Sequence, residues 1–270
     1  MEEPREIAER ATILRCQVGS GLHGTAMAGT DDRDEMGICI APARFVAGLA
    51  PFEQYVHRTA WERTGTHRRS REQPRSRAGD LDLIVYSLRK WMRLALAANP
   101  TVLLPLFAPP SERVTLTPLG RELIALTPSI LSRRAARTFS GYAASQRRRL
   151  LGVRGRHGRP RPANGEGQDG YDGKSAMHML RLGIQGVELL ETGRITLPVP
   201  QPDLALLRAV RAGEVPLPEV LDHAQRVERR LTALERESPL PAGPDVDAVD
   251  DWLVSAHLRS WAAEGSPFAA

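Results

Sequence analysis

The sequence has few cysteines and few lysines. Its two cysteines, Cys16 and Cys39, lie inside apolar, strand-like runs, and two distant cysteines do not have the ligand spacing of a zinc site. We expect both to be reduced core residues of a cytoplasmic protein, and not a disulfide framework. Lys90 and Lys174 are the only lysines. Arginine therefore carries nearly all of the positive charge, a bias more typical of a GC-rich genome than of a function.

Long hydrophobic runs are also missing. No apolar stretch approaches the roughly 20 residues of a membrane span, and the acidic N-terminus MEEPREIAER lacks the apolar region of a signal peptide. These absences predict a cytoplasmic location and no membrane partner. A Walker-type glycine–lysine loop, a Ser-His-Asp order and an internal repeat are absent as well.

The chain does contain enough apolar material for a core, together with a small excess of positive charge. Hydrophobic residues make up 41% of its 270 residues, and the formal net charge is +5. This length suits one large domain or two modest ones. The charge favours anionic partners such as nucleotides or nucleic acid, although many basic proteins bind neither.

Two kinds of hydrophobic pattern divide the chain near residue 110. Before it, ATILRCQV, EMGICIAP and DLDLIVYSL are typical of strands, and the third runs directly into a helix that ends before Pro100. After it, helical periodicity predicts helices at 118–126, 133–152, 174–193, 217–237 and 245–261, with Gly193 as a C-terminal cap. Polar segments at 57–79 and 154–170 are expected to be loops.

These patterns predict an α+β fold. We expect a small mixed-sheet domain over residues 1–110, followed by an α-helical domain over residues 111–270.

An acidic cluster lies between the first two predicted strands. It contains Asp31, Asp32, Asp34 and Glu35. Residues two apart on a strand point to the same face, so Asp32 and Asp34 are expected to project side by side. Two such carboxylates repel unless a cation lies between them. The alternative interpretation is a solvated acidic turn, which is the commoner reason for such a run.

The third predicted strand also opens with acids, Asp80 and Asp82. If it lies beside the second strand, one of these carboxylates completes a group of three. Carboxylate oxygens suit a hard ion such as Mg²⁺, and metal ions held by three carboxylates are a common device of phosphoryl chemistry.

Gly19 and Ser20 follow the first predicted strand. A glycine there allows a ligand to approach the backbone, and the N–H groups at the start of a helix suit a phosphate. His23 follows one turn later. A lone Gly-Ser pair is more often an ordinary turn.

The predicted helix at 174–193 carries a third set of candidates. Lys174, His178 and Arg181 lie four and three residues apart, so they share a helix face. Lys174 and Arg181 are candidates to bind a triphosphate or the backbone of an acceptor. A solvated basic face is the alternative, and His178 alone is equally consistent with a hydrogen-bonded core residue.

Taken together, these pieces resemble one known family. The matching stretches are GSGLHGT, GTDDRDEMGICI, GDLDLIVYSLRKWMRLALAANPTVLLPLF and YDGKSAMHMLRLGIQGVELLETG, with shorter matches reaching past residue 215. They are similar to the nucleotidyltransferase superfamily of DNA polymerase β, and within it to the RNA-repair-pathway polymerase-β-like family of bacteria and phages. DDRDEMG and KSAMHMLRLG are the more specific matches.

The resemblance implies a role for each candidate. Asp32, Asp34 and Asp82 would be the catalytic, metal-binding carboxylates, for Mg²⁺ or Mn²⁺. Gly19 and Ser20 would hold a nucleoside triphosphate, and His23, Lys174, His178 and Arg181 join this nucleotide-binding set. The glycine three places after Asp34 fits the family, which favours Asp32 and Asp34 over their acidic neighbours.

The leading hypothesis is therefore a template-independent nucleotidyltransferase. It would transfer a nucleoside monophosphate from a nucleoside triphosphate to a hydroxyl group, with release of pyrophosphate. One metal ion would lower the pKa of that hydroxyl and a second would stabilise the leaving pyrophosphate. Asp82 would accept the proton or bind the metal ion beside the nucleophile.

Two other functions stay open. The first is an RNA-binding module in which arginine-rich segments at 57–77 and 147–162 bind and the carboxylates are inactive; the second is a regulatory, toxin–antitoxin-like component. The acceptor is equally open among an RNA end, a protein hydroxyl and a small molecule, as are the base of the nucleotide, the choice between Asp80 and Asp82, and the oligomeric state.

Overall fold

The structure is a computed structural model that describes residues 3–27, 29, 31–66, 74, 76–152 and 171–265. The chain forms two compact units. We call residues 1–96, 101–130 and 245–270 the sheet unit, and residues 97–100 and 131–244 the helical unit. The last helix therefore belongs to the sheet unit. The division into domains at residue 110 stays a prediction.

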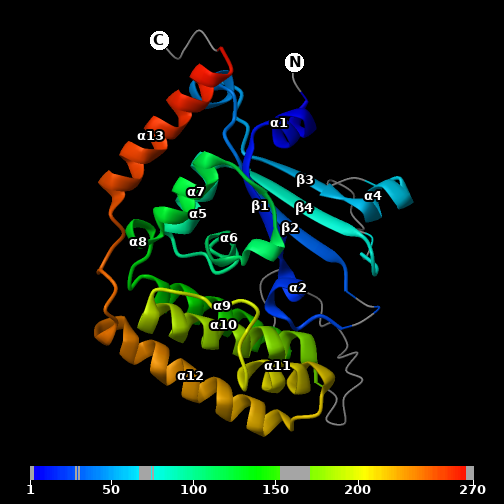
Figure 1. The fold of residues 1–270 in the computed structure, drawn as a ribbon. Helices are drawn as coiled ribbons and strands as arrows, with labels where there is room; N and C mark the ends of the chain where they lie inside the picture. Colours follow the sequence, from blue (N-terminus) through cyan, green and yellow to red (C-terminus); the bar gives the residue numbers. More distant parts are fainter. Residues whose placement is uncertain are drawn as a thin grey trace. The chain divides into compact units, whose positions relative to one another are not determined.

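A mixed five-stranded sheet forms the centre of the sheet unit (Figure 1). Its strands are β1 (Thr12–Val18), β2 (Arg33–Cys39), β3 (Gln54–Arg58), β4 (Leu81–Ser87) and β5 (Arg113–Leu116). They lie in the order β3-β4-β2-β1-β5, and only β2 and β4 run parallel to each other among these neighbours. The predicted α+β class with a small mixed sheet is confirmed.

Among its described residues the sheet unit also contains helices, all of them short except the last. They are α1 (Pro4–Arg10), α2 (Gly19–His23), α3 (Ala43–Ala47), α4 (Thr59–Thr64), α5 (Leu88–Leu96), α6 (Leu104–Phe107), the 3₁₀ turn η1 (Pro110–Glu112), α7 (Pro118–Ala125), α8 (Thr127–Ile130) and α13 (Val246–Ala263). The expectation of a loop from residue 57 is wrong at its start, because β3 and α4 occupy residues 54–64. Residues 67–73 and 75 of that segment lie outside the described residues.

The two faces of the sheet are covered differently. Side chains alternate between faces along a strand. Met36 and Ile38 are buried on the face that also carries Asp34, whereas Leu83 and Val85 lie on the opposite face and pack against α1. One face therefore carries the Asp34 carboxylate, and the opposite face packs against α1.

Helix α13 joins the sheet unit by side-chain contacts. The Trp252 indole donates to Glu122 at 3.0 Å, and the Arg259 guanidinium forms an ion pair with the same carboxylate. The Trp261 indole donates to the Ala41 carbonyl at 3.0 Å. These contacts hold α13 against α7 and against the residues that follow β2.

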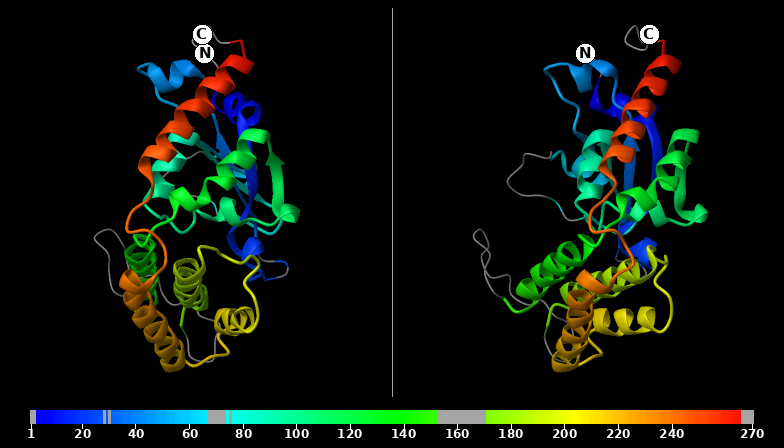
Figure 2. Two further views of the ribbon diagram at one scale, coloured as in Figure 1. Left: turned by 60° about the vertical axis from the view of Figure 1, so that its left-hand side comes forward. Right: turned by 90° about the vertical axis from the view of Figure 1, so that its left-hand side faces the viewer.

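The described part of the helical unit contains the helices α9 (Ala135–Leu150), α10 (Gly173–Thr192), α11 (Asp203–Ala212) and α12 (Leu217–Glu237). Helix α10 contacts α9, α11 and α12, which Figure 2 shows from two sides. Apolar residues of α10 such as Met177 and Leu180 pack in the core of this unit. Asp172 caps its start by accepting from the Ser175 amide, and Gly193 ends it in the left-handed conformation. The predicted cap at Gly193 is therefore confirmed.

The predicted helices at 118–126, 133–152, 174–193, 217–237 and 245–261 correspond to α7, α9, α10, α12 and α13 within a few residues at each end. The predicted loop at 154–170 lies outside the described residues. No helix in the described part of the chain combines the length and apolar character needed to span a membrane.

Candidate metal centre

The parallel register of β2 and β4 determines where the first acids lie. Asp34 on β2 is the direct partner of Asp82 on β4, and on its other side it is the partner of Val18 at the end of β1. Directly paired residues project from the same face of a sheet. The carboxylates of Asp34 and Asp82 therefore lie side by side.

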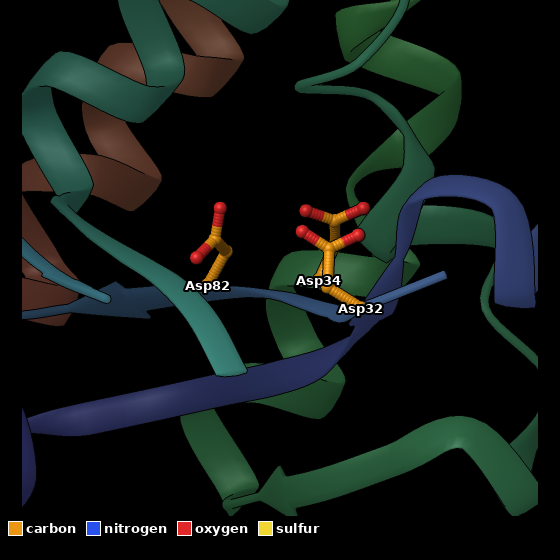
Figure 3. A group of neighbouring side chains, drawn as sticks. All are labelled: Asp32, Asp34 and Asp82. Carbon is orange, nitrogen blue, oxygen red and sulfur yellow. The ribbon is translucent and has the colours of Figure 1, made fainter. Parts of the chain in front are cut away.

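Asp32, just before β2, completes a group of three. One carboxylate oxygen from each of Asp32, Asp34 and Asp82 lies within 4.8 Å of the others. Their side chains point to the same side of the sheet (Figure 3). All three are half-buried. The structure thus brings together the three acids that were singled out from the sequence.

Gly19 lies directly against this group. Its φ of +69° is in the left-handed region that favours glycine, and a Cβ atom there would be 2.1 Å from Oδ2 of Asp34. No side chain fits at this position without displacing the carboxylate. Ser20 is the next residue of α2, and His23, at the end of that helix, is only 2% exposed. Their roles toward a nucleotide stay predictions.

Asp82 has two polar neighbours. The Ser76 hydroxyl donates to its Oδ1 at 3.0 Å, and Nε of Arg58 lies 3.4 Å from its Oδ2. Burial raises the pKa of Asp82 above its ordinary value, Arg58 and Ser76 oppose that rise, and Asp32 and Asp80 add to it. A carboxylate in this setting binds protons and cations more readily than a solvated one.

The neighbouring acids have other partners. The Arg63 guanidinium and the Arg77 amide donate to Asp80, and the hydrogen bond from Arg63 is the main reason that the pKa of Asp80 is lowered. The Asp31 carboxylate accepts from the Met27 amide at 2.7 Å. Asp80 is not part of the carboxylate group, which favours Asp82 as its third member.

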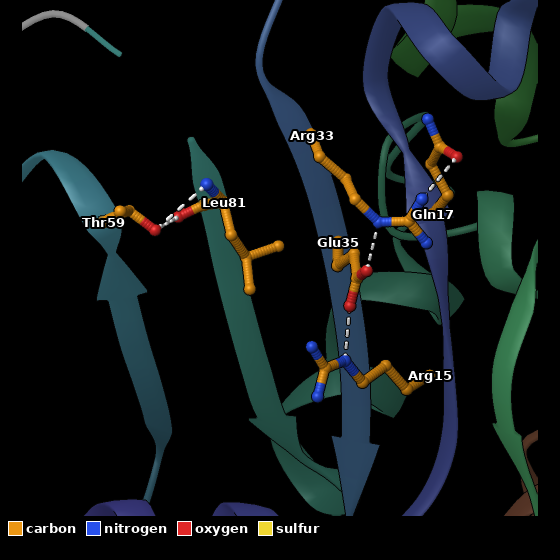
Figure 4. A network of polar contacts seen from close by, with 6 residues as sticks. All are labelled: Arg15, Gln17, Arg33, Glu35, Thr59 and Leu81. Atoms are coloured by element: carbon orange, nitrogen blue, oxygen red, sulfur yellow. Dashed lines mark hydrogen bonds and ion pairs between the residues drawn. The ribbon is translucent and has the colours of Figure 1, made fainter. Parts of the chain in front are cut away.

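Glu35 lies on the opposite face of β2 from Asp34. Its carboxylate is buried and accepts from the guanidinium groups of Arg15 and Arg33 (Figure 4). Close by, the Thr59 hydroxyl accepts from the Leu81 amide at 3.1 Å and so joins the start of α4 to the start of β4. Glu35 therefore has a structural role, and one step along the strand separates it from the face that carries Asp34 and Asp82.

Helix α10 buries a positive charge in the helical unit. Arg181 is 9% exposed; its Nη1 donates to Gln185 at 2.8 Å, and its Nε has no hydrogen-bond partner among the described residues. No carboxylate within the described ranges forms an ion pair with it. Burial lowers the pKa of Arg181 to about 10. A buried guanidinium without a counter-ion is costly, and an anion would satisfy it.

His178 belongs to the same surroundings. Its Nδ1 is also buried without a partner in the described chain. Burial, followed by the charges of Arg181, Lys174 and Arg211, lowers the pKa of His178 to about 3, so the ring is neutral at pH 7. Lys174 itself is exposed. The predicted set Lys174, His178 and Arg181 is thus a partly buried basic group, and not a uniformly solvated face.

Sequence reasoning missed Ser76 and Arg58 as neighbours of Asp82. Both lie in or beside a polar, arginine-rich stretch that carries no hydrophobic period. Arg58 ends β3, and its pairing with Asp82 across β3 and β4 is a matter of register. No local sequence signal distinguishes it from the other arginines.

Comparisons with known proteins identify the family of the chain. Residues 1–255 match the model of a family described as the RNA repair pathway DNA polymerase beta family, RlaP. Among solved structures, a nucleotidyltransferase-like protein from Exiguobacterium sibiricum 255-15 matches at 12% sequence identity over 86% of this chain and 71% of that chain, with a TM-score of 0.29. That likeness is too low to argue from. No curated protein matches. The family match covers the acidic group, both compact units and all but the end of the chain, and the chain belongs to the RNA repair pathway DNA polymerase beta family.

Proposed function

We propose that this protein transfers a nucleoside monophosphate from a nucleoside triphosphate to a hydroxyl acceptor and releases pyrophosphate. The observation that carries the proposal is the convergence of Asp32, Asp34 and Asp82 within 4.8 Å on one side of the sheet. Membership of a polymerase-β-like family supports the same chemistry.

The donor set fits a hard divalent cation. All three side chains offer oxygen only, and a cation would relieve their mutual repulsion. Asp34 and Asp82 come from the neighbouring strands β2 and β4, and Asp32 directly precedes β2. Mg²⁺ is the first candidate and Mn²⁺ the second. When bound, such an ion would neutralise charge on the phosphates and make the acceptor hydroxyl more acidic.

The chain's own residues would accept the proton and bind the phosphate groups. Asp82, which accepts a hydrogen bond from a hydroxyl, would take the acceptor's proton. Gly19 brings backbone, with no side chain, against Asp34, and a phosphate would approach that backbone beside the carboxylates. Arg181, Lys174 and the neutral His178 form a basic group for an anion, either the triphosphate or the backbone of the acceptor.

The family description makes an RNA end the first acceptor to test. A protein hydroxyl and a small molecule would be tested beside it.

The test is pyrophosphate release in the presence of Mg²⁺, each nucleoside triphosphate and RNA. The double substitution Asp32→Asn and Asp34→Asn should abolish release, because an amide does not neutralise the charge of the cation and binds it less firmly than a carboxylate. Asp31→Asn is the matched control: it changes an acid in the same stretch that lies outside the group, and it should keep the wild-type rate.

Equal release by the double variant and the wild type would remove the assignment. RNA binding that persists in the double variant, with no release by the wild type, would favour the RNA-binding module with an inactive fold.

A further inference from the structure

A hydroxyl of the protein itself lies against one of the proposed catalytic carboxylates. Ser76 Oγ donates to Oδ1 of Asp82 at 3.0 Å, and the Ser76 side chain is half-buried. Asp82 Oδ2 faces Arg58. A hydroxyl therefore already lies at the carboxylate oxygen that would accept its proton.

Secondary structure does not explain this bond. Ser175 makes a similar bond to Asp172 at 2.8 Å, but there the aspartate also accepts from the Ser175 amide and caps the start of α10. Asp82 is the second residue of β4 and caps no helix. The contact between Ser76 and Asp82 thus has the geometry of an acceptor hydroxyl with its base, for which a separation of about 2.6–3.2 Å is needed.

We propose that Ser76 is an acceptor in its own active site, so that the protein attaches a nucleoside monophosphate to itself. The inference rests on the proposed function. Ser76 Oγ attacks the α-phosphorus, and a phosphoester bond forms between them. The bond from the α-phosphorus to the bridging oxygen breaks, and pyrophosphate leaves with its electrons. The hydroxyl proton passes to Oδ1 of Asp82, and nothing is oxidised or reduced.

Modification of Ser76 would prevent further modification at the same residue. Once esterified, Ser76 carries a nucleotide beside Asp82 and no longer has a proton to give. Another hydroxyl can then reach Asp82 only by displacing that nucleotide. Self-modification would stop at one nucleotide per chain at this position and would slow transfer to any other acceptor.

The experiment uses the full-length chain, Mg²⁺ and each of the four nucleoside triphosphates, without added acceptor. The intact mass should rise by one nucleoside monophosphate. Trypsin would leave Ser76 in a dipeptide, because Arg75 and Arg77 flank it. A protease that cleaves after glutamate instead gives the peptide 73–112, in which fragmentation should place the nucleotide on Ser76.

Two variants and a control complete the design. Ser76→Ala should lose the added mass, and Ser76→Thr, which keeps a hydroxyl, should retain it at position 76. Ser111→Ala is the control, since Ser111 lies in the same peptide, is exposed and follows Pro110 in η1, away from β4 in the sequence. It should be modified like the wild type.

The outcomes separate this inference from the proposed function. Unmodified wild type that still releases pyrophosphate with an added RNA acceptor overturns the inference and leaves the function standing. A nucleotide that is found elsewhere, or that stays on folded Ser76→Ala, also overturns it. Absence of pyrophosphate release under every condition overturns both.

Discussion

At the scale of single residues, the position of the Asp34 carboxylate depends on the absence of a side chain at residue 19. Gly19 has a positive φ and lies where a Cβ would collide with Asp34. The effect of the positive φ can be separated from that of the contact with Asp34, because several other glycines have a positive φ and no atom near their Cβ position. Gly65, which ends α4 at φ +65°, has nothing within 4 Å of its Cβ position.

Gly19→Ala should therefore abolish the proposed pyrophosphate release, and Gly65→Ala should not. Each costs roughly 1–2 kcal/mol of stability through its left-handed backbone. Only Gly19→Ala also displaces the Asp34 carboxylate, and a displacement on the order of 1 Å lowers rates about 100-fold. Pyrophosphate release and urea unfolding of both variants measure the two effects. Equal activity in the two variants would mean that the contact with Asp34 is unimportant.

At the scale of elements, β2 carries two consecutive acids with opposite tasks. Asp34 faces two other carboxylates, and Glu35 faces two guanidinium groups on the other side of the sheet. Alternation along a strand is the whole cause of the difference. A one-residue slip in register would exchange the two acids, so the pairing of Glu35 with Arg15 and Arg33 also opposes such a slip.

Neutralising these two acids should change stability in opposite directions. Without divalent cations, Asp34→Asn removes repulsion within the acidic group and should raise the free energy of unfolding by about 1 kcal/mol. Glu35→Gln breaks a buried, charge-assisted pair and should lower it by about 1–3 kcal/mol. Urea unfolding in EDTA measures both. If Asp34→Asn is as destabilising as Glu35→Gln, the repulsion between the carboxylates is not significant.

Elements also differ in how well the sequence predicted them. β1, β2 and β4, the three central strands, appear as apolar runs because both faces or one whole face is buried. β3 and β5 were missed, and they are the two edges of the sheet. Their residues, QYVHR and RVTL, are only partly buried, so no hydrophobic period marks them. Helix α11 was missed because it is a short helix between prolines and Gly213.

At the scale of the whole molecule, each compact unit contains a histidine with a lowered pKa, the half-buried His178 in the helical unit and the buried His257 in the sheet unit. Burial lowers the pKa of His178 in the helical unit to about 3, and it also lowers the pKa of His257 in the sheet unit. An unfolded histidine takes up a proton below its ordinary pKa of 6.5. Between pH 6.5 and 3 the unfolded chain therefore binds more protons than the folded one, and stability falls as the pH falls.

Acidification from pH 7 to pH 5 should cost the helical unit about 2 kcal/mol through His178. His178→Gln should remove most of that dependence, although it lowers stability at pH 7. The residual slope should come from groups such as His257. Urea unfolding of both proteins at the two pH values measures the difference. An unchanged slope in His178→Gln would show that the ring is protonated in the folded protein.

By itself, the sequence determined the kinds of group available and their local placement. The spacing of Asp32 and Asp34 before an apolar strand, the glycine after β1 and the end of α10 at Gly193 all follow from local periods and local backbone preferences.

The tertiary structure decided which of these groups meet. It put β4 beside β2 in a register that pairs Asp34 with Asp82 and leaves Asp80 to Arg63. It also brought Ser76 to Asp82 and buried Arg181 with no counter-ion among the residues that the structure describes. The physical reason is that strand order and burial arise from contacts between distant parts of the chain, and a local hydrophobic period carries no information about them.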